Sequence, residues 1–512
     1  MKIIFVSLAI LFLTITKPIE AQTINEAIEL PDTTGSTITE IKGVLLDINT
    51  HDPLPYANIF VLHQHTGTIS NENGHFLLNV QGLDKTDTVQ FKYIGYTTKT
   101  LTVSDLDSMS VIYLQEEIFN LDEILVFAST PDARSIVKRI VKNLDSNYKE
   151  TTCKKQIFIR ERYNSELTNI KLNYKKSSIP DIDREMINKL ENGIPKQSIS
   201  YSDFLGNFYF SDTKEDSLSL KIEPLRTVAL KDKDLAEFEE LISVFEDILK
   251  NTKEDEYWKV KSGLFSQKLD LENDSSEMAQ DTLGKNERKL KYFRGRMAYQ
   301  LKYSTLKDKD SWEFLYKTGK YKYTIAGGTR VNGEDVYIID FEPDNSGLYT
   351  GRIYVAIESY ALIRADYEYA PEKTGTDFHL FGVGYTENQF KGSVYFEKRG
   401  DYYRLKYFSK KAGSIVDFDR SLALLKKKER FLFDKKLNEI KVGVKISVNS
   451  EQLFECLVMD YENISEEAFD QFSEKNKMKI IYVDKFDKSL WKGYAIIEPT
   501  QQMKDYKKQL PN

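Results

Sequence analysis

Cysteine, histidine and tryptophan are scarce in this sequence, with two, five and three copies among 512 residues. Two cysteines cannot build the dense disulfide framework of a small secreted domain. Cys153 and Cys456 also lack the paired spacing of zinc-binding cysteines, so they do not predict a zinc site. The sequence leaves open one long-range disulfide between them or two separately buried thiols, and we favour the two thiols.

The five histidines form no recognisable metal or catalytic motif. No HExxH sequence and no His-x-x-Glu pair is present, so the sequence does not predict a zinc-peptidase site. His63 and His65, expected at alternate positions on one face of a strand, are the nearest approach to a metal pair. Because no third ligand lies near them in the sequence, we interpret them as a surface feature and predict no metal and no cofactor.

Motifs for nucleophiles and phosphate binding are missing as well. The chain has no GxSxG sequence. The segment GTRVNG, residues 328–333, has P-loop-like glycine spacing, but Glu334 and Asp335 stand where Lys and Ser/Thr are required. Two acids there would repel a phosphate, so the segment predicts a hairpin turn. We predict no catalytic residue, although the carboxylate pairs of glycosidases leave no local mark in a sequence.

Positive charge does not dominate the composition. The formal net charge is −7 and the isoelectric point is about 5.6, whereas nucleic-acid-binding proteins present a basic face. We therefore expect no nucleic-acid partner. Lysine-rich clusters such as Leu425 to Arg430 are offset by acidic residues elsewhere, and we interpret them as solvated faces.

Long apolar runs are confined to the N-terminus. Lys2 precedes an apolar run from Ile3 to Leu13, followed by a plausible cleavage site between Ala21 and Gln22. We therefore expect residues 1–21 to be a signal peptide. No cysteine lies near this site, which excludes a lipoprotein anchor, and no later stretch approaches about 18 unbroken apolar residues. The mature chain is expected to have no transmembrane span and to be exported.

Residues 41–127 show short alternating segments separated by turns, after a polar linker at 22–40. In the segment TVQFKYI, Val89, Phe91 and Tyr93 point to one side, which is typical of a half-buried strand. Asn73-Gly74 predicts a tight turn, and Gly95 predicts a bend at a strand end. Strands at this spacing predict a β-sandwich of the seven-strand type, and the glycines have a structural rather than a catalytic role.

The order of these motifs resembles the carboxypeptidase-regulatory-like domain of exported Bacteroidetes proteins. The residues that carry the resemblance are Gly43, Pro55, Ala57, Gly67, Gly74, Phe76, Gly95 and Tyr96, together with Asp47 and the closing Leu121-Asp122-Glu123. The same domain begins many TonB-dependent receptors, in which a plug and a barrel follow. This sequence instead continues with a helical stripe of apolar residues between Ile136 and Leu144, and Pro131 and Asp132 predict the start of that helix.

The rest of the chain predicts a larger α+β domain with an extended antiparallel sheet, so the fold class is mainly β with some α. We divide it into a helix and strand region at 128–270 and a β-rich region at 271–512. The first region includes an acidic amphipathic helix between Leu235 and Leu249. The hairpin pattern of the second resembles uncharacterised Bacteroidetes proteins and, more loosely, the half-barrel of lipoprotein carriers.

Three functions fit this sequence. The leading hypothesis is a non-enzymatic exported protein of the periplasm or outer-membrane side, which binds a protein partner of the cell envelope through its sandwich and large sheet. The alternative is a carrier of a lipid or other apolar ligand, which requires an uncovered apolar face on the hairpins from Tyr321 to Leu405. The third is a glycan-active enzyme, so lipid and glycan are both candidate ligands.

Overall fold

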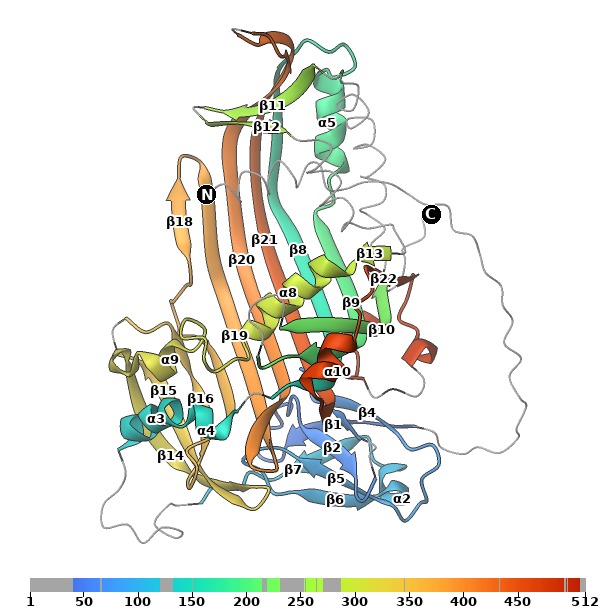
Figure 1. The fold of residues 1–512 in the computed structure, drawn as a ribbon, viewed down its shortest axis with the longest axis vertical. Helices are drawn as coiled ribbons and strands as arrows, with labels where there is room; N and C mark the ends of the chain where they lie inside the picture. The colour runs from blue at the N-terminus through green and yellow to red at the C-terminus, as the bar shows by residue number, and fades with distance from the viewer. Residues whose placement is uncertain are drawn as a thin grey trace, which may run out of the picture.

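The computed structural model describes most of the chain from residue 40 onward. The described residues are 40–64, 67–119, 132–149, 151–213, 219–230, 253, 255–263, 265–269, 287–344, 346–431, 433–491, 494 and 496–506. They form a small N-terminal domain and one large curved sheet (Figure 1). The predicted helix at Leu235 to Leu249 lies outside the described residues.

The N-terminal domain is a sandwich of two small sheets. One sheet has the order β4(His75–Asn79), β1(Glu40–Asp47), β7(Val111–Leu114), and the other has the order β3(Gly67–Ile69), β2(Asn58–Val61), β5(Thr88–Lys92), β6(Lys99–Thr102). Their inward side chains, including Leu45, Ile59 and Phe91, form one buried core. The predicted seven-strand sandwich is therefore confirmed in its strand number and layers.

Most of the residues behind the family resemblance hold this sandwich together. Gly43 leaves room for the Phe76 ring, which lies 2.7 Å from the position of a Cβ atom there. Gly74 has a φ of +75° in the predicted turn, a conformation that glycine adopts without strain. The Tyr96 hydroxyl donates to Asp47 Oδ2 at 2.8 Å. The remaining residues lie in the core, strands and turns: Pro55, Ala57, Gly67 and Gly95.

One sheet of 14 strands contains most of the remaining chain. Its main path runs β14-β15-β16-β17-β19-β20-β21-β8-β9-β10-β23. The bounds are β8 Cys153–Ser177, β9 Gln197–Phe210, β10 Leu220–Leu230, β11 Glu256–Ser262, β12 Phe265–Leu269, β14 Tyr321–Val331, β15 Glu334–Pro343, β16 Tyr349–Ala356, β17 Leu362–Tyr369, β18 Asp377–Leu380, β19 Val383–Arg399, β20 Tyr402–Lys428, β21 Lys435–Asn463 and β23 Ile481–Val483. Almost every pairing is antiparallel, as predicted, and β10 with β23 is the parallel exception.

The predicted division at residue 270 does not separate two sheets. β21 pairs with β8 over more than twenty residues, which joins the end of the chain to its first long strand. The regions 128–270 and 271–512 therefore share one sheet. Alternation of apolar and polar residues predicts where a strand lies, but not which strand pairs with it. The pairing of β8 with β21 across residue 270 could therefore not be predicted from the sequence.

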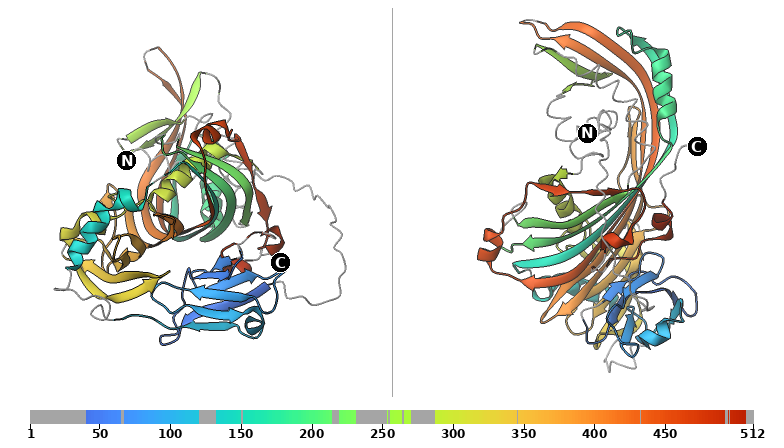
Figure 2. Two further views of the ribbon diagram at one scale, coloured as in Figure 1. Left: turned by 60° about the horizontal axis from the view of Figure 1, so that its bottom comes forward. Right: turned by 90° about the vertical axis from the view of Figure 1, so that its right-hand side faces the viewer.

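The large sheet curves strongly, and its two faces carry different parts of the chain. Phe408 packs on the concave face in the core that includes residues of the helices, whereas its neighbour Tyr407 packs on the opposite face against Tyr56. The concave face carries α8(Leu290–Lys302), and the sandwich lies against the convex face (Figure 2). The other helices are α2 Val103–Leu106, α3 Ala133–Lys142, α4 Leu144–Asn147, α5 Arg184–Gly193, α9 Glu313–Tyr316, α10 Glu466–Gln471 and α11 Gln501–Lys504, with β13 Glu287–Lys289 paired to β22 Lys477–Lys479.

The apolar face of the β14–β17 hairpins is covered. Helix α3 begins after its N-cap Asp132, as predicted, and buries Ile136, Val137 and Ile140. These residues join Trp312, Phe314 and the inward side chains of β15–β17 in one core. The uncovered face that the lipid-carrier hypothesis requires between Tyr321 and Leu405 is therefore filled by α3, α8 and α9.

Cys153 and Cys456 are both buried, and neither is in a disulfide. In the β8–β21 ladder Cys456 pairs with Ile159, six residues from Cys153 (159 − 153 = 6). Six residues of strand span about 20 Å, far beyond the reach of a disulfide. The structure thus has two separate buried thiols, and burial raises the pKa of Cys456 to about 12.

We expect neither cysteine to react with a water-soluble thiol reagent while the protein is folded, because both lack solvent access and Cys456 lacks thiolate character. Both should react at once after unfolding in denaturant without reductant. Titration of thiols in the native and denatured protein measures this directly. A count of zero thiols in the denatured protein would contradict the assignment, since it would reveal a disulfide.

Candidate functional site

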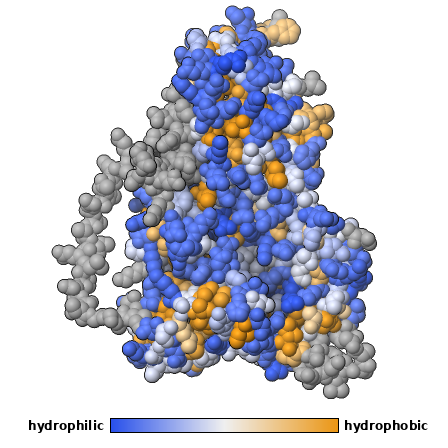
Figure 3. Space-filling view, turned by 180° about the vertical axis from the view of Figure 1, so that it is seen from behind, coloured by the Kyte–Doolittle hydropathy of each residue, from blue (hydrophilic) through white to orange (hydrophobic). Residues whose placement is uncertain are grey.

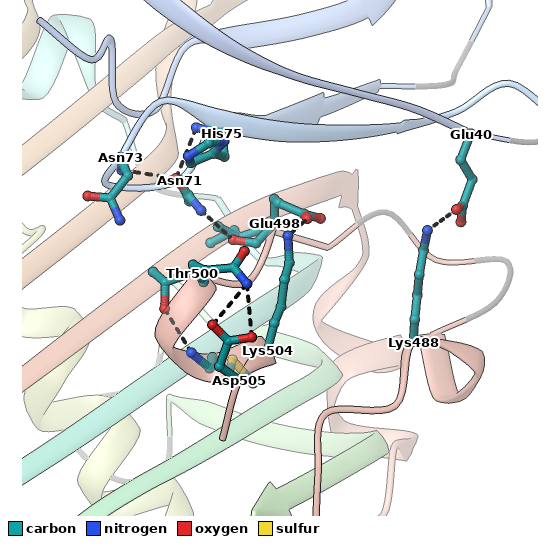
Figure 4. A network of polar contacts seen from close by, with 12 residues as sticks. Glu40, Asn71, Asn73, His75, Lys488, Glu498, Thr500, Lys504 and Asp505 are labelled. Carbon is teal, nitrogen blue, oxygen red and sulfur yellow. Dashed lines mark hydrogen bonds and ion pairs between the residues drawn. The ribbon is translucent and has the colours of Figure 1, made fainter. Parts of the chain in front are cut away.

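The turn that follows β3 attaches the sandwich to the C-terminal part of the chain. The Asn71 side-chain oxygen accepts hydrogen bonds from the backbone of Asn73 and His75, at 2.9 and 3.1 Å. Its amide Nδ2 donates to the carbonyl oxygen of Glu498 at 3.0 Å (Figure 4). The segment that contains the predicted tight turn is therefore bonded to a segment that lies more than 400 residues later in the chain.

Arg160 attaches the same C-terminal segment to the convex face of the large sheet. Its guanidinium binds both carboxylate oxygens of Asp203, at 2.8 and 2.7 Å, and donates to the carbonyl oxygen of Ile497 at 2.7 Å. The Thr68 hydroxyl donates to the neighbouring Ile496 carbonyl at 3.3 Å. Residues 496–498 therefore lie between the sandwich and the sheet and are bonded to both.

Further contacts surround this junction. Lys488 pairs with Glu40, and Lys504 pairs with Glu498 (Figure 4). The Tyr56 and Tyr407 rings stack at 4.3 Å between centroids. These contacts combine buried polar bonds with aromatic packing, so the sandwich is a fixed part of the molecule and not a tethered module.

A cleft of about 830 Å³ lies beside this junction, between the sandwich and the sheet. It contains five cationic side chains, each of which already contacts a protein group. The contacts are Arg330 with Asp335, Arg364 with Asp366 and Tyr93, Arg399 with Glu397, Lys406 with the Val458 carbonyl, and Lys92 with the Phe60 ring. Each cation of the cleft therefore already has a contact within the protein.

A second pocket, of about 460 Å³, lies on the concave face. It is formed by the end of α8, the loop that follows it, and six strands. Six tyrosines line it: Tyr163, Tyr299, Tyr303, Tyr349, Tyr369 and Tyr385. Tyr299 and Tyr163 are 59% and 45% exposed, so two of the rings are open to solvent at the rim. Such a lining offers flat apolar faces and hydroxyl groups together.

Lys410 is the buried cation of this pocket. It is 8% exposed, and its Nζ lies 3.6 Å from the centroid of the Tyr303 ring. Among the described residues no carboxylate forms an ion pair with it. Burial lowers the pKa of Lys410 to about 8, and the nearby Glu387 charge only partly opposes this shift. A buried ammonium without a carboxylate partner is costly unless another anion binds it.

Two of the three acids that line the pocket are engaged within the protein, and the third, Asp310, is exposed. Glu387 accepts from the Thr376 backbone at 2.8 Å and from the Tyr385 hydroxyl at 3.2 Å. Asp308 accepts from the Ser311 hydroxyl at 2.9 Å. By contrast, Gln300 Oε1 is buried and has no hydrogen-bond partner among the described residues. The pocket therefore combines the Lys410 ammonium and the Gln300 acceptor with the tyrosine hydroxyl groups.

The family comparison concerns the sandwich. Residues 41–126 match the family model of the CarboxypepD_reg-like domain. The first domain is a CarboxypepD_reg-like domain. This confirms the predicted family and agrees with the predicted bounds of 41–127 to within one residue. The match covers the sandwich alone, so it describes neither the large sheet nor its pocket.

Solved structures give only distant similarities to the chain that carries this CarboxypepD_reg-like domain. A LolA superfamily protein from Nitrosomonas europaea has 10% identity and a TM-score of 0.17, covering 66% of this chain and 98% of its own. A putative outer membrane lipoprotein-sorting protein domain from Vibrio parahaemolyticus has 9% identity and a TM-score of 0.19, covering 66% and 98%. The MucA/MucB complex of Pseudomonas aeruginosa has 8% identity and a TM-score of 0.16, covering 62% and 94%. At these TM-scores the similarities carry no functional argument.

Two further comparisons are negative. No curated protein matches the chain. None of the described helices combines the length and the apolar composition needed to cross a bilayer. The predicted signal peptide and its cleavage site at Ala21 and Gln22 lie outside the described residues, so they stay predictions.

The structure separates the residues that the sequence suggested as metal ligands. His63 has a φ of +63° in the turn after β2, so it is not on a strand as predicted, and His65 lies outside the described residues. The described residues contain no group of three or more His, Cys, Asp or Glu side chains that could hold a metal. The segment 328–333 forms the predicted hairpin turn, with Asn332 and Gly333 at positive φ between β14 and β15.

The pocket itself was not predicted. Its residues come from segments between Tyr163 and Gln452, and only the fold brings them together. The sequence contains 31 tyrosines, but half-exposed sheets account for a high tyrosine content as well as a pocket does. Lys410 stands in the pair Lys410-Lys411, where no local pattern distinguishes the buried lysine from its neighbour, which forms an ion pair with Glu451.

The interface of the CarboxypepD_reg-like domain contains a carboxyl group that titrates near neutral pH. Glu455 is 2% exposed, and burial raises its pKa to about 7, an effect that Arg160 partly opposes. Its usual value is 4.5. The folded protein therefore holds more protons than the unfolded chain between these two values, so Glu455 makes stability fall as pH rises from 4.5 to 7.

We expect Glu455→Gln to remove this fall, because a neutral amide cannot lose a proton. In the unaltered protein, the ionisation of Glu455 over this pH range lowers the free energy of unfolding by on the order of 3 kcal/mol. Thermal unfolding midpoints of both proteins across this pH range measure the effect. Identical pH profiles would contradict the assignment.

Glu451→Gln is the matched control on the same face of β21. Burial raises the pKa of Glu451, but Lys411 and Arg162 outweigh it and keep the pKa low. Glu451 therefore stabilises the fold above its unfolded pKa, and its replacement should lower stability at neutral pH. The two substitutions thus act with opposite signs.

Proposed function

We propose that this protein is a non-enzymatic, exported binding protein of the cell envelope whose concave pocket holds an anionic, hydroxylated ligand, of which an acidic glycan is the best fit. The observation that carries the proposal is Lys410, a buried ammonium that has an aromatic contact but no carboxylate partner among the described residues. A carboxylate or phosphate on the ligand would supply that partner.

The surroundings of Lys410 favour a glycan over an apolar ligand. Sugar rings present both C–H faces, which pack on aromatic rings, and hydroxyl groups, which need hydrogen-bond partners. The tyrosine lining offers the first, and Gln300 Oε1 offers an acceptor for the second. A lipid chain would leave these polar groups unsatisfied. The covered β14–β17 face also argues against the lipid carrier.

The non-enzymatic part of the proposal rests on how the pocket's acids are used. Glu387 and Asp308 accept hydrogen bonds from protein groups, and Lys302 pairs with Asp308 at 3.7 Å. An acid that donates a proton to a leaving group needs access to the ligand with its proton in place. In this proposal these acids shape the pocket, while the CarboxypepD_reg-like domain on the opposite face remains available for a protein partner.

The test uses trigalacturonate as an anionic probe and maltotriose as a neutral one, measured by isothermal titration calorimetry. We expect trigalacturonate to bind and Lys410→Met to weaken it by about tenfold or more, because a charge-assisted hydrogen bond is lost. The control is Lys391→Met on β19, whose side chain is 67% exposed outside the pocket, and it should leave binding unchanged.

Three outcomes would count against the proposal. Equal affinity of Lys410→Met and the unaltered protein for trigalacturonate would show that the Lys410 ammonium does not bind the ligand. Tighter binding of maltotriose than of trigalacturonate would show that the ligand does not need a negative charge. Shortened products of the probe, detected by mass spectrometry after incubation with unaltered protein, would favour the glycan-active enzyme.

A further inference from the structure

The hairpin between β20 and β21 ends in two fully exposed phenylalanines. The ladder of these strands closes at the pair Lys428 and Lys435, and the turn between them has the sequence ERFLFD. Phe431 and Phe433 are 102% and 87% exposed. The end of the β20–β21 hairpin stands at the upper end of the molecule in Figure 1, opposite the sandwich, and Figure 3 shows apolar atoms at that end. No packing requirement of the described residues explains two bare aromatic rings there.

Basic residues predominate around this tip. Residues 425–436 contain six basic and two acidic side chains, a formal charge of 6 − 2 = +4 in a chain whose net charge is −7. Three of the lysines pair with acids of the adjoining segments, whereas Lys427, Arg430 and Lys435 form no ion pair among the described residues. Both acids are engaged, Glu429 with Lys268 at 2.7 Å and Asp434 with the Tyr257 hydroxyl. The lysine-rich cluster that composition alone suggested to be a solvated face therefore surrounds an apolar point.

This combination fits a membrane surface better than a protein groove or a small molecule. The tip protrudes, so it offers no concavity to a small ligand. Aromatic side chains enter the boundary between headgroups and acyl chains, while lysines around them contact anionic headgroups through long flexible stems. Tyr257, whose ring lies 4.4 Å from Lys268 Nζ, adds an amphipathic aromatic just below the tip.

We propose that the β20–β21 tip docks onto an anionic lipid bilayer, with Phe431 and Phe433 inserted at the interface and the surrounding lysines on the headgroup phosphates. This goes beyond the proposed glycan pocket, because it concerns the opposite end of the long strands and does not depend on the pocket. The protein then stands on the membrane by its hairpin tip, with the sandwich held away from the surface.

A second exposed turn in the same sheet provides an internal comparison. Phe381, in the turn between β18 and β19, is 71% exposed. Its surroundings carry both signs of charge: His379 lies 3.4 Å from Asp377 and 3.8 Å from Asp417, and the Arg420 side chain lies beside Gly382. An exposed phenylalanine without an excess of basic neighbours should bind an anionic surface weakly, so this position tests whether an exposed aromatic ring alone is sufficient.

The test is co-sedimentation of the exported chain, from Gln22 onward, with vesicles of equal parts phosphatidylethanolamine and phosphatidylglycerol. We expect binding that phosphatidylcholine vesicles do not give. The double variant F431S/F433S should reduce it by about tenfold or more, and K435E/K436E should reduce it and flatten its salt dependence. Phe381→Ser is the matched control and should bind as the unaltered protein does.

Insertion is measured separately with tryptophan at the tip. Fluorescence of Phe431→Trp should be quenched by brominated lipid in excess of the three native tryptophans, whereas Phe381→Trp should show no excess. Absence of vesicle binding by the unaltered protein, or equal binding of F431S/F433S, overturns the proposal. Because the replaced side chains are exposed, unchanged circular dichroism should accompany each variant and exclude misfolding as the cause.

Discussion

The buried pair of Arg160 and Asp203 is the interaction on which the arrangement of this molecule depends. One guanidinium joins β8 to β9 and, through the Ile497 carbonyl, also binds the C-terminal segment that supports the sandwich. Arg160 is 3% and Asp203 1% exposed, so either charge without the other would be buried at high cost. The planar fork of arginine serves all three contacts at once, which lysine could not do.

The two faces of the large sheet have different roles: the convex face holds the first domain, and the concave face holds the pocket. On the convex face, buried charges and the stacked pair of Tyr56 and Tyr407 attach the CarboxypepD_reg-like domain. On the concave face, α3, α8 and α9 fill the lower part with apolar core, and the tyrosine pocket opens beside the end of α8. Adjacent residues of one strand serve different surfaces: Lys410 enters the pocket, and Lys411 pairs with Glu451.

Local patterns were sufficient to predict the parts of the fold that local chemistry determines. The turn at Asn73-Gly74, the hairpin at Asn332-Gly333 and the cap at Asp132 each follow from the conformation of one or two residues. The pairing of β21 with β8 and the gathering of Lys410, Gln300 and six tyrosines depend on contacts between distant segments. A single sequence contains no signal for these contacts, so the pocket could be found only in the structure.

The position of residues 496–498 has a consequence for how the protein is assembled. The sandwich is encoded first and has its own core, so it can fold while the rest of the chain is still being synthesised. Its place on the sheet is made by Asn71 and Thr68 bonding to carbonyls of a segment encoded last. The first domain must therefore wait for the end of the chain before it docks, and a chain that stopped before Ile496 would carry a folded but unattached domain.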